Sequence, residues 1–150
     1  MLMMLFRRSG HDEGEERGEL VQQAWTAAQQ AEPNISLIDA RPAKQYTGED
    51  AGGLSRAGHI PGAASLYWMQ QLVSPENPVL KPVAELRKLY EEAGVKPGQL
   101  VVTYCRSGMQ ASHTYFTAKY LGYDVTLYDG SFGEWVSVEG TEVVKGNAKK

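Results

Sequence analysis

Three short apolar runs constrain the fold more than any other feature of this 150-residue chain. The runs ISLIDAR (35–41), QLVVTYC (99–105) and YDVTLYDG (123–130) are too short for helices and suit strands buried on both faces of a parallel sheet. Apolar residues recur at helical spacing in the segments 83–93 and 110–122. This alternation predicts an α/β fold, with one central parallel sheet and helices on both of its faces.

The two ends of the chain differ in composition from this central part. Residues 1–17 run into an acidic, glycine-rich stretch without aromatic side chains, and we predict a disordered N-terminal tail there. A short helix is expected from Leu20 until Glu32 and Pro33 end it. We therefore place one domain at residues 18–140 and a C-terminal tail at 141–150.

Net charge bears on the partners of this chain, and its N-terminal run and cysteine content bear on its location. A net charge of −3 offers no broad cationic face, so we expect no nucleic acid and no membrane partner. The apolar N-terminal run is six residues long and its basic residues follow it, unlike a secretory signal. A single cysteine cannot form an internal disulfide, which favours a reducing, cytoplasmic location.

The single cysteine, Cys105, lies where the second strand run gives way to a helical pattern. A thiol reacts as its anion, and loop N–H groups, a helix N-terminus and a nearby cation each stabilise that anion. Cys105 is followed by Arg106, by Gly108 in a tight loop, and by the predicted helix. A lone cysteine is more often an inert core residue, but this context favours a catalytic nucleophile.

Three motifs in a fixed order then resemble one family. The loop CRSGMQ, from Cys105 to Gln110, resembles the active-site loop of the rhodanese-type sulfurtransferases. GHIPGAASL (58–66) is similar to the first signature of that family, and VTLYDGSFGEW (125–135) to the second. The resemblance covers roughly residues 20–137 and is strongest to the catalytic C-terminal half of tandem thiosulfate or 3-mercaptopyruvate sulfurtransferases.

The resemblance implies a rhodanese-like domain that transfers sulfur by a ping-pong mechanism. Cys105 would take a sulfane sulfur from a small-molecule donor and pass it, as a persulfide, to cyanide or a thiol acceptor. No cofactor and no metal is implied. Because only one half of the tandem architecture fits in this chain, a homodimer and a separate partner domain both stay open. A non-catalytic relay module, carrying persulfide to a partner protein, is the alternative function.

The resemblance also suggests the substrate-binding residues. The loop residues Arg106, Ser107, Gly108, Met109 and Gln110 are expected to surround the transferred sulfur, with Arg41 and Arg56 as further cations. For Arg41 we favour a structural pair with Asp39, and for His59 a structural contact with backbone carbonyls.

Two departures from the family pattern bear on the donor. Gln45 and Ser107 stand where thiosulfate enzymes have cations, so the donor is undecided, and we favour thiosulfate. The six-residue loop without a terminal arginine argues against the phosphatase relatives of the fold.

Overall fold

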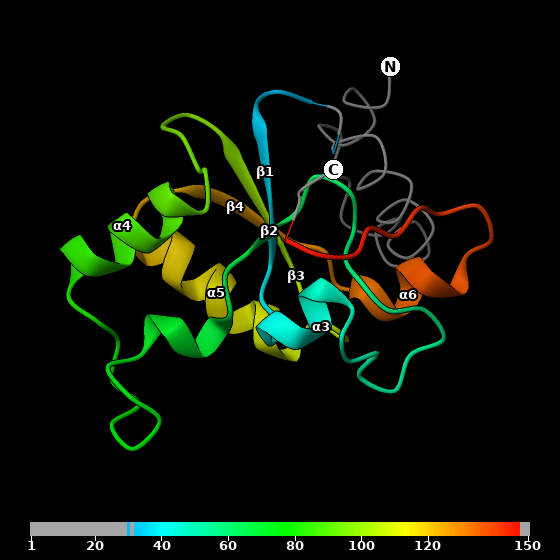
Figure 1. Cartoon of the computed structure of the whole chain (residues 1–150). Coiled ribbons are helices and arrows are strands. Elements are labelled where there is room, and N and C mark those ends of the chain that lie inside the picture. Colours follow the sequence, from blue (N-terminus) through cyan, green and yellow to red (C-terminus); the bar gives the residue numbers. More distant parts are fainter. Residues whose placement is uncertain (1–29, 31, 148–150) are drawn as a thin grey trace, which may run out of the picture.

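The computed structural model describes residue 30 and residues 32–147, so the predictions for residues 1–17 and most of the expected helix before Pro33 lie outside the described residues. The elements are arranged around one sheet (Figure 1). In chain order they are β1 (Ile35–Asp39), α3 (Ala43–Thr47), β2 (Ala64–Ser65), the 3₁₀ helix η1 (Trp68–Gln71), α4 (Val83–Glu92), β3 (Leu100–Tyr104), α5 (Met109–Tyr120), β4 (Asp124–Leu127) and α6 (Ser131–Ser137).

The sheet has four strands in the order β2-β1-β3-β4, and every pairing is parallel. The three strands expected from the apolar runs are therefore confirmed. In the register of β1 and β3, Ile35 lies opposite Leu100 and Asp39 lies opposite Tyr104. Because parallel strands end at the same edge, the residues after Asp39 and after Tyr104 become neighbours in space.

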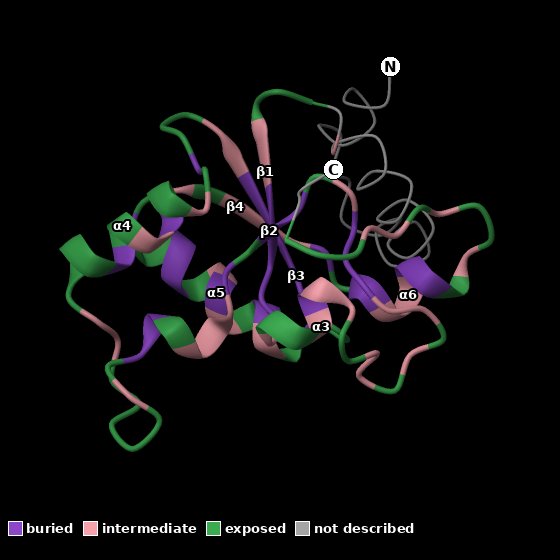
Figure 2. Cartoon of the chain, viewed as in Figure 1, coloured by how far each residue is buried: buried purple, intermediate pink, exposed green. Residues whose placement is uncertain are grey.

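Side chains alternate between the two faces of the sheet and build two cores. Leu37 and Val102 face the core that α3 and α6 cover, whereas Ile38 and Val101 face the core that α4 and α5 cover. Figure 1 shows the two pairs of helices on opposite sides of the sheet, and Figure 2 shows that the central strands are buried. The prediction of helices on both faces is confirmed.

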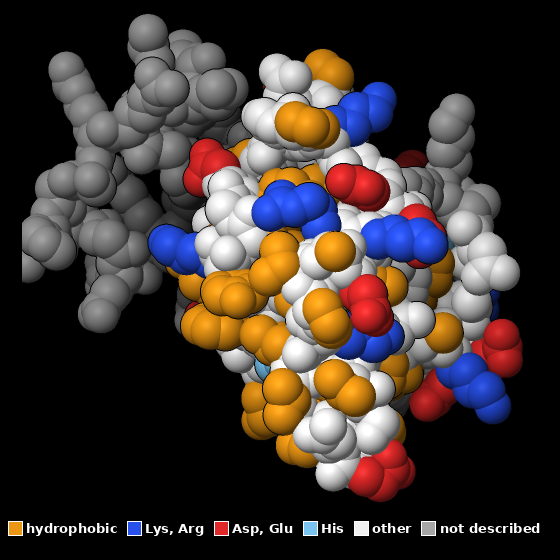
Figure 3. All heavy atoms as spheres, turned by 90° about the vertical axis from the view of Figure 1, so that its left-hand side faces the viewer, with side chains coloured by type: hydrophobic (Ala, Val, Ile, Leu, Met, Phe, Trp, Pro, Cys, Tyr) orange, Lys and Arg blue, Asp and Glu red, His pale blue; other side chains and the backbone are white. Residues whose placement is uncertain are grey.

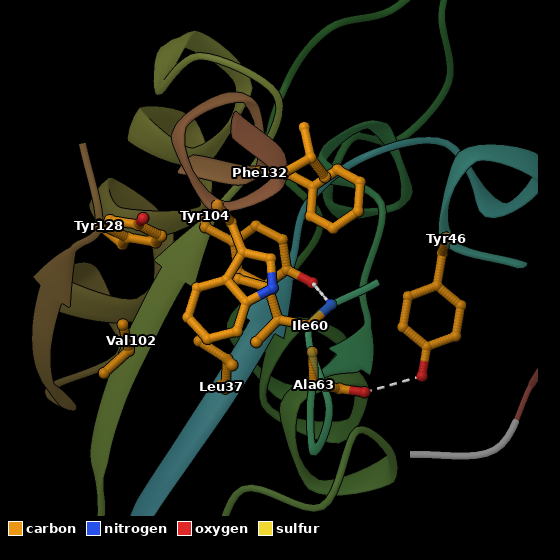
Figure 4. Packing of buried hydrophobic residues seen from close by; sticks show 10 residues of the cluster. Leu37, Tyr46, Ile60, Ala63, Val102, Tyr104, Tyr128 and Phe132 are labelled. Carbon is orange, nitrogen blue, oxygen red and sulfur yellow. Dashed lines mark hydrogen bonds between the residues drawn. The ribbon is translucent and has the colours of Figure 1, made fainter. Parts of the chain in front are cut away.

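The aromatic core beneath α6 also fixes the loop that precedes β2. The Tyr104 hydroxyl accepts a hydrogen bond from the N–H of Ile60 at 3.1 Å, and the Tyr46 hydroxyl donates to the carbonyl of Ala63 at 2.7 Å (Figure 4). Both phenols are buried, and burial raises the pKa of Tyr46 to about 12. These contacts hold the GHIPGA segment against the carboxyl end of the sheet.

The two long helices agree with the sequence pattern. Helix α4 ends one residue before Ala93, and α5 is followed by Gly122 in the left-handed conformation, with φ +87°. Among the described residues, no helix is both long and apolar enough to cross a membrane.

Four short elements, β2, η1, α3 and α6, differ from the local sequence pattern. The run AASLYW (63–68) suits extended structure, but the strand covers only Ala64–Ser65 and Trp68 already begins η1. The reason is tertiary: buried Gln71 in η1 donates to the Thr114 hydroxyl at 3.0 Å and accepts from the Tyr90 hydroxyl at 3.0 Å. Helices α3 and α6 were not predicted, because each is short and lies next to turn residues.

Residues after 140 contact the domain where they are described. Val144 forms an antiparallel bridge with His59, and the Trp135 indole N–H donates to the carbonyl of Glu142 at 2.8 Å. Gly58 has φ +129°, and a Cβ there would clash with the carbonyl oxygen of Val144. This part of the predicted tail therefore packs against the loop before β2.

Candidate active site

Cys105 directly follows β3 and is almost completely buried, with 1% of its surface exposed. The N–H of Gly108 donates to the Cys105 sulfur at 3.1 Å. Gly108 has φ +95°, the left-handed conformation that glycine adopts without strain, and α5 begins at the next residue. The chain thus turns back over the sulfur, so that a backbone N–H and the N-terminus of a twelve-residue helix lie beside it.

The first turn of α6 holds the first two loop residues in place. The N–H of Cys105 donates to the Ser131 hydroxyl at 3.2 Å, and the N–H of Phe132 donates to the carbonyl of Cys105 at 2.9 Å. The N–H of Gly133 donates to the carbonyl of Arg106 at 3.0 Å. A Cβ at position 133 would lie 2.9 Å from that carbonyl oxygen, so the close approach favours glycine there.

Ser131, Phe132 and Gly133 are therefore positioning residues that sequence reasoning missed. The motif VTLYDGSFGEW contains all three, but it served only as a family signature, with no role assigned to these residues. The sequence did contain a signal for this contact. The loop CRSGMQ and the motif VTLYDGSFGEW each run past the end of a strand, and the ends of parallel strands meet at the same edge of a sheet.

Small side chains surround the base of the loop. Cys105 packs in a cluster with Ala40 and Ala111, against which Trp68 and Leu127 also pack. The loop thus packs between Ala40, directly after β1, and Ala111 in the first turn of α5.

His113 lies one turn into α5, beside that cluster. Its ring contacts Trp68 edge-on, with 5.3 Å between the ring centroids. Burial lowers the pKa of His113, which favours the neutral imidazole.

The five predicted loop residues lie together after Cys105. Arg106, Ser107 and Met109 are exposed, Gln110 is half-buried and Gly108 is buried. The Arg106 guanidinium lies beside Gly53, since a Cβ built on Gly53 would be 3.4 Å from its Nη2. An Asp129 carboxylate oxygen would lie 3.1 Å from a Cβ on Gly108, which places Asp129 at the same edge.

Arg41 is placed within the fold. Its guanidinium forms a buried ion pair with Asp39, with 2.6 Å between Nη2 and Oδ2, and donates to the carbonyl of Gly58 at 2.6 Å. It also lies 4.0 Å from the centre of the Phe132 ring. Burial alone would lower the pKa of Arg41, but the Asp39 carboxylate outweighs it and raises that pKa. These contacts agree with the structural pair, and a role in substrate binding stays a prediction.

Arg56 lies at the carboxyl end of α6. Its guanidinium donates to the carbonyls of Val136 and Val138 and to the carbonyl and hydroxyl of Thr141. Among the described residues, none of these hydrogen bonds reaches the Cys105 loop. The guanidinium donates to carbonyls that have no hydrogen-bond partner within the helix at the end of α6. The predicted contact of Arg56 with substrate stays a prediction.

His59 lies in the core and not in the loop around Cys105. Its Nδ1 lies 2.8 Å from the carbonyl oxygen of Tyr46, and the two rings are stacked with centroids 3.7 Å apart. The expected contact with a backbone carbonyl is confirmed.

Comparison with known proteins identifies the family of this chain. The family described as "Rhodanese-like domain" matches residues 22–138. The chain is 40% identical over 120 residues to the sulfur carrier protein TtuD of Thermus thermophilus, covering 74% of this chain and 41% of that protein. It is 39% identical over 110 residues to a thiosulfate sulfurtransferase of Corynebacterium glutamicum, covering 67% of this chain and 35% of that protein.

Solved structures show the same fold at lower identity. The anaerobic ergothioneine biosynthesis enzyme of Chlorobium limicola, in complex with trimethyl histidine, matches with a TM-score of 0.74 at 22% identity, covering 82% of this chain and 31% of that one. The chain spans about two fifths of the curated relatives it matches, in agreement with the likeness to one part of a tandem protein. By its sequence, its fold and the loop around Cys105, the chain belongs to the rhodanese-like domain family.

Proposed function

We propose that this domain transfers sulfane sulfur, with Cys105 as the nucleophile and carrier. The observation that supports this most directly is the Gly108 N–H, 3.1 Å from the sulfur at the N-terminus of α5. A backbone N–H aimed at sulfur stabilises a thiolate, and it stabilises a persulfide anion in the same way.

The reaction has two half-reactions. The Cys105 thiolate attacks the outer sulfur of thiosulfate, a sulfur–sulfur bond forms, and sulfite leaves with the electron pair of the broken bond. Cyanide or a thiolate then attacks the outer sulfur of the persulfide, which returns Cys105 to its thiolate. The turn of Ser131 and Phe132 keeps the loop backbone fixed through both steps, so the N–H dipoles need no reorganisation.

Thiosulfate is the donor that we propose first. It is a dianion, and the exposed Arg106 provides a cation at the mouth of the loop. The relative in C. glutamicum is named a thiosulfate sulfurtransferase, which supports the same donor. 3-Mercaptopyruvate is the second donor to test, because Ser107 leaves this part of the loop without a second cation.

A carrier function is the second candidate. The similar protein in T. thermophilus is named a sulfur carrier. Cys105 is the only cysteine of this chain, so a persulfide formed there has no internal thiol to resolve it. In this function the domain would hold the sulfur until a partner protein removes it.

Steady-state turnover separates the two functions. We expect purified protein with thiosulfate and cyanide to form thiocyanate, and Cys105→Ser to abolish it. Ala118→Ser, a similar change at a buried position of α5, controls for effects on folding. A persulfide without turnover would support the carrier function, and turnover that survives Cys105→Ser would exclude Cys105 as the nucleophile.

A further inference from the structure

The outer face of α5 exposes three large apolar side chains in one line. Met109, Phe116 and Tyr120 are exposed by 81%, 58% and 59%. At about 100° per residue these positions fall within roughly 40° of one another around the helix. The opposite side of α5 packs on the sheet through buried Ala111 and Ala118. We call the line of Met109, Phe116 and Tyr120 the α5 outer face.

Two of these side chains, Phe116 and Tyr120, lie against each other. The rings of Phe116 and Tyr120 are stacked, with an interplanar angle of 8° and centroids 6.4 Å apart. Aromatic residues and methionine are enriched in the centres of protein interfaces, where rigid rings lose little entropy on binding. Figure 3 shows hydrophobic side chains gathered on this side of the molecule, with charged side chains among them.

The segment that carries this face is cationic, although the chain as a whole is acidic. Residues 106–123 contain Arg106 and Lys119 and no aspartate or glutamate. Arg87 of α4 extends the cationic character to the far end of α5, where it donates to the carbonyl of Leu121 at 3.2 Å. At the near end, the carboxylate of Asp129 lies beside Gly108. An apolar surface edged with acidic side chains would complement this face.

The α5 outer face is continuous with the sulfur site. Met109 directly follows Gly108, whose N–H contacts the Cys105 sulfur. Because Cys105 is only 1% exposed, a folded acceptor cannot bring a thiol from a flat surface onto that sulfur. A thiol on an extended segment could enter the loop while the rest of the acceptor rests on α5.

We propose that the α5 outer face docks a protein that accepts sulfur, with an apolar, acid-edged surface and its thiol on an extended segment. The inference rests on the proposed function. In the transfer step the acceptor thiolate attacks the outer sulfur of the Cys105 persulfide and forms a new sulfur–sulfur bond. The bond to the Cys105 sulfur breaks, and Cys105 keeps its electron pair as a thiolate.

The test uses two synthetic peptides as acceptors. One is acetyl-Cys-Gly-Leu-Trp-Glu-Glu-amide, and the other carries Lys-Lys in place of Glu-Glu. Six extended residues span about 20 Å. Phe116 lies only about 10 Å along the helix from Met109. Protein loaded with thiosulfate and freed of excess donor is mixed with each peptide, and the loss of about 32 Da from the protein is followed over time.

We expect the wild-type protein to transfer sulfur faster to the acidic peptide than to the basic one. In Phe116→Ser/Tyr120→Ser the second-order rate constant for the acidic peptide should fall about tenfold, which corresponds to 1.4 kcal/mol. The rate with cyanide should not change. Val83→Ser, at an exposed apolar residue of α4, is the control and should match wild type.

Three results would overturn the inference. These are equal rates for the two peptides, an unchanged rate in the double variant, or a wild-type dimer that the double variant separates on gel filtration, which would make the face a contact between copies of this chain. In each case a persulfide that still forms leaves the proposed function standing. A wild-type protein that takes up no sulfur would overturn both.

Discussion

Two neighbouring strand ends in this molecule hold their functional groups in different ways. At the end of β1, the Asp39 carboxylate and the Arg41 guanidinium satisfy each other, and a carbonyl takes a further N–H of the arginine. At the end of β3, the Cys105 sulfur receives a backbone N–H from its own loop. The strands are in register, with Asp39 opposite Tyr104, so the two ends lie side by side.

The difference explains where chemistry can occur. A buried ion pair with well-placed partners is difficult to disturb, and its reactive atoms are all engaged. A sulfur held by backbone dipoles can exchange one anionic form for another while the surrounding backbone stays fixed. We therefore expect changes at the β1 end to affect stability first, and changes at the β3 end to affect sulfur transfer first.

The largest effect on stability is expected from Arg41→Met. Removing the guanidinium leaves the Asp39 carboxylate buried without its counter-ion, and such a change costs about 3–5 kcal/mol. Urea denaturation measures this loss. Asp39→Leu/Arg41→Met, which removes both charges, should recover part of the free energy of unfolding. A loss below about 1 kcal/mol in Arg41→Met would contradict a structural role for the pair.

Gly108→Ala tests the other strand end and has a matched control in Gly122→Ala. Both glycines have a left-handed φ, of +95° and +87°, so each alanine should cost about 1 kcal/mol of stability. At Gly122 the new Cβ meets nothing within 4 Å, whereas at Gly108 it lies 3.1 Å from Asp129. We expect rapid-quench mass spectrometry to show slower persulfide formation in Gly108→Ala alone. Equal slowing in both variants would mean that the loop conformation is not specifically required.

Ser131→Ala should have a smaller effect on the same strand end. It removes the acceptor of the Cys105 N–H and leaves that group buried without a partner, at a cost of about 1–2 kcal/mol. Ser137→Ala, in the same helix, loses only an exposed hydrogen bond to the carbonyl of Glu134. The melting temperature and the kcat for thiocyanate formation should both fall in Ser131→Ala. Both should stay near the wild-type values in Ser137→Ala. Larger effects in Ser137→Ala than in Ser131→Ala would exclude the proposed support of the Cys105 loop by α6.

The smallest effect is expected in the dependence of stability on pH. Burial lowers the pKa of His113 in the folded state, while the unfolded chain has a value of about 6.5. The unfolded state therefore binds more protons between the two values, and stability falls as the pH drops from about 6.5 through the folded-state pKa. Melting temperatures between pH 7.5 and 5.5 should fall less in His113→Asn than in wild type. If the melting temperatures of the two proteins depended on pH in the same way, His113 would be excluded as the source of the loss of stability.

Much of this comparison could be predicted from the sequence. The strands ending at Asp39 and Tyr104 were expected from apolar runs that are too short for helices, and a local pattern is enough for that. The position of Cys105 followed, because a loop between strand and helix has few alternative arrangements. The pairing of Asp39 with Arg41 needed only a spacing of two residues.

The remaining features depend on contacts between distant segments. Nothing near Ser131 indicates that its hydroxyl accepts the N–H of Cys105, which lies 26 positions earlier in the chain. Nothing near Arg56 indicates that its guanidinium donates to the carbonyl of Val136 at the end of α6, 80 positions later in the chain. Its role in substrate binding stays a prediction. The start of η1 at Trp68 is fixed by Gln71 and its two buried partners, which override local preference.

Intact-mass measurement of the protein after exposure to thiosulfate shows directly whether Cys105 carries a sulfane sulfur. We expect a gain of about 32 Da, one sulfur atom, on the wild-type protein and none on Cys105→Ser. Addition of cyanide should remove that mass and release thiocyanate. A wild-type protein that gains no mass, or a Cys105→Ser variant that gains the same mass, would contradict a persulfide on Cys105.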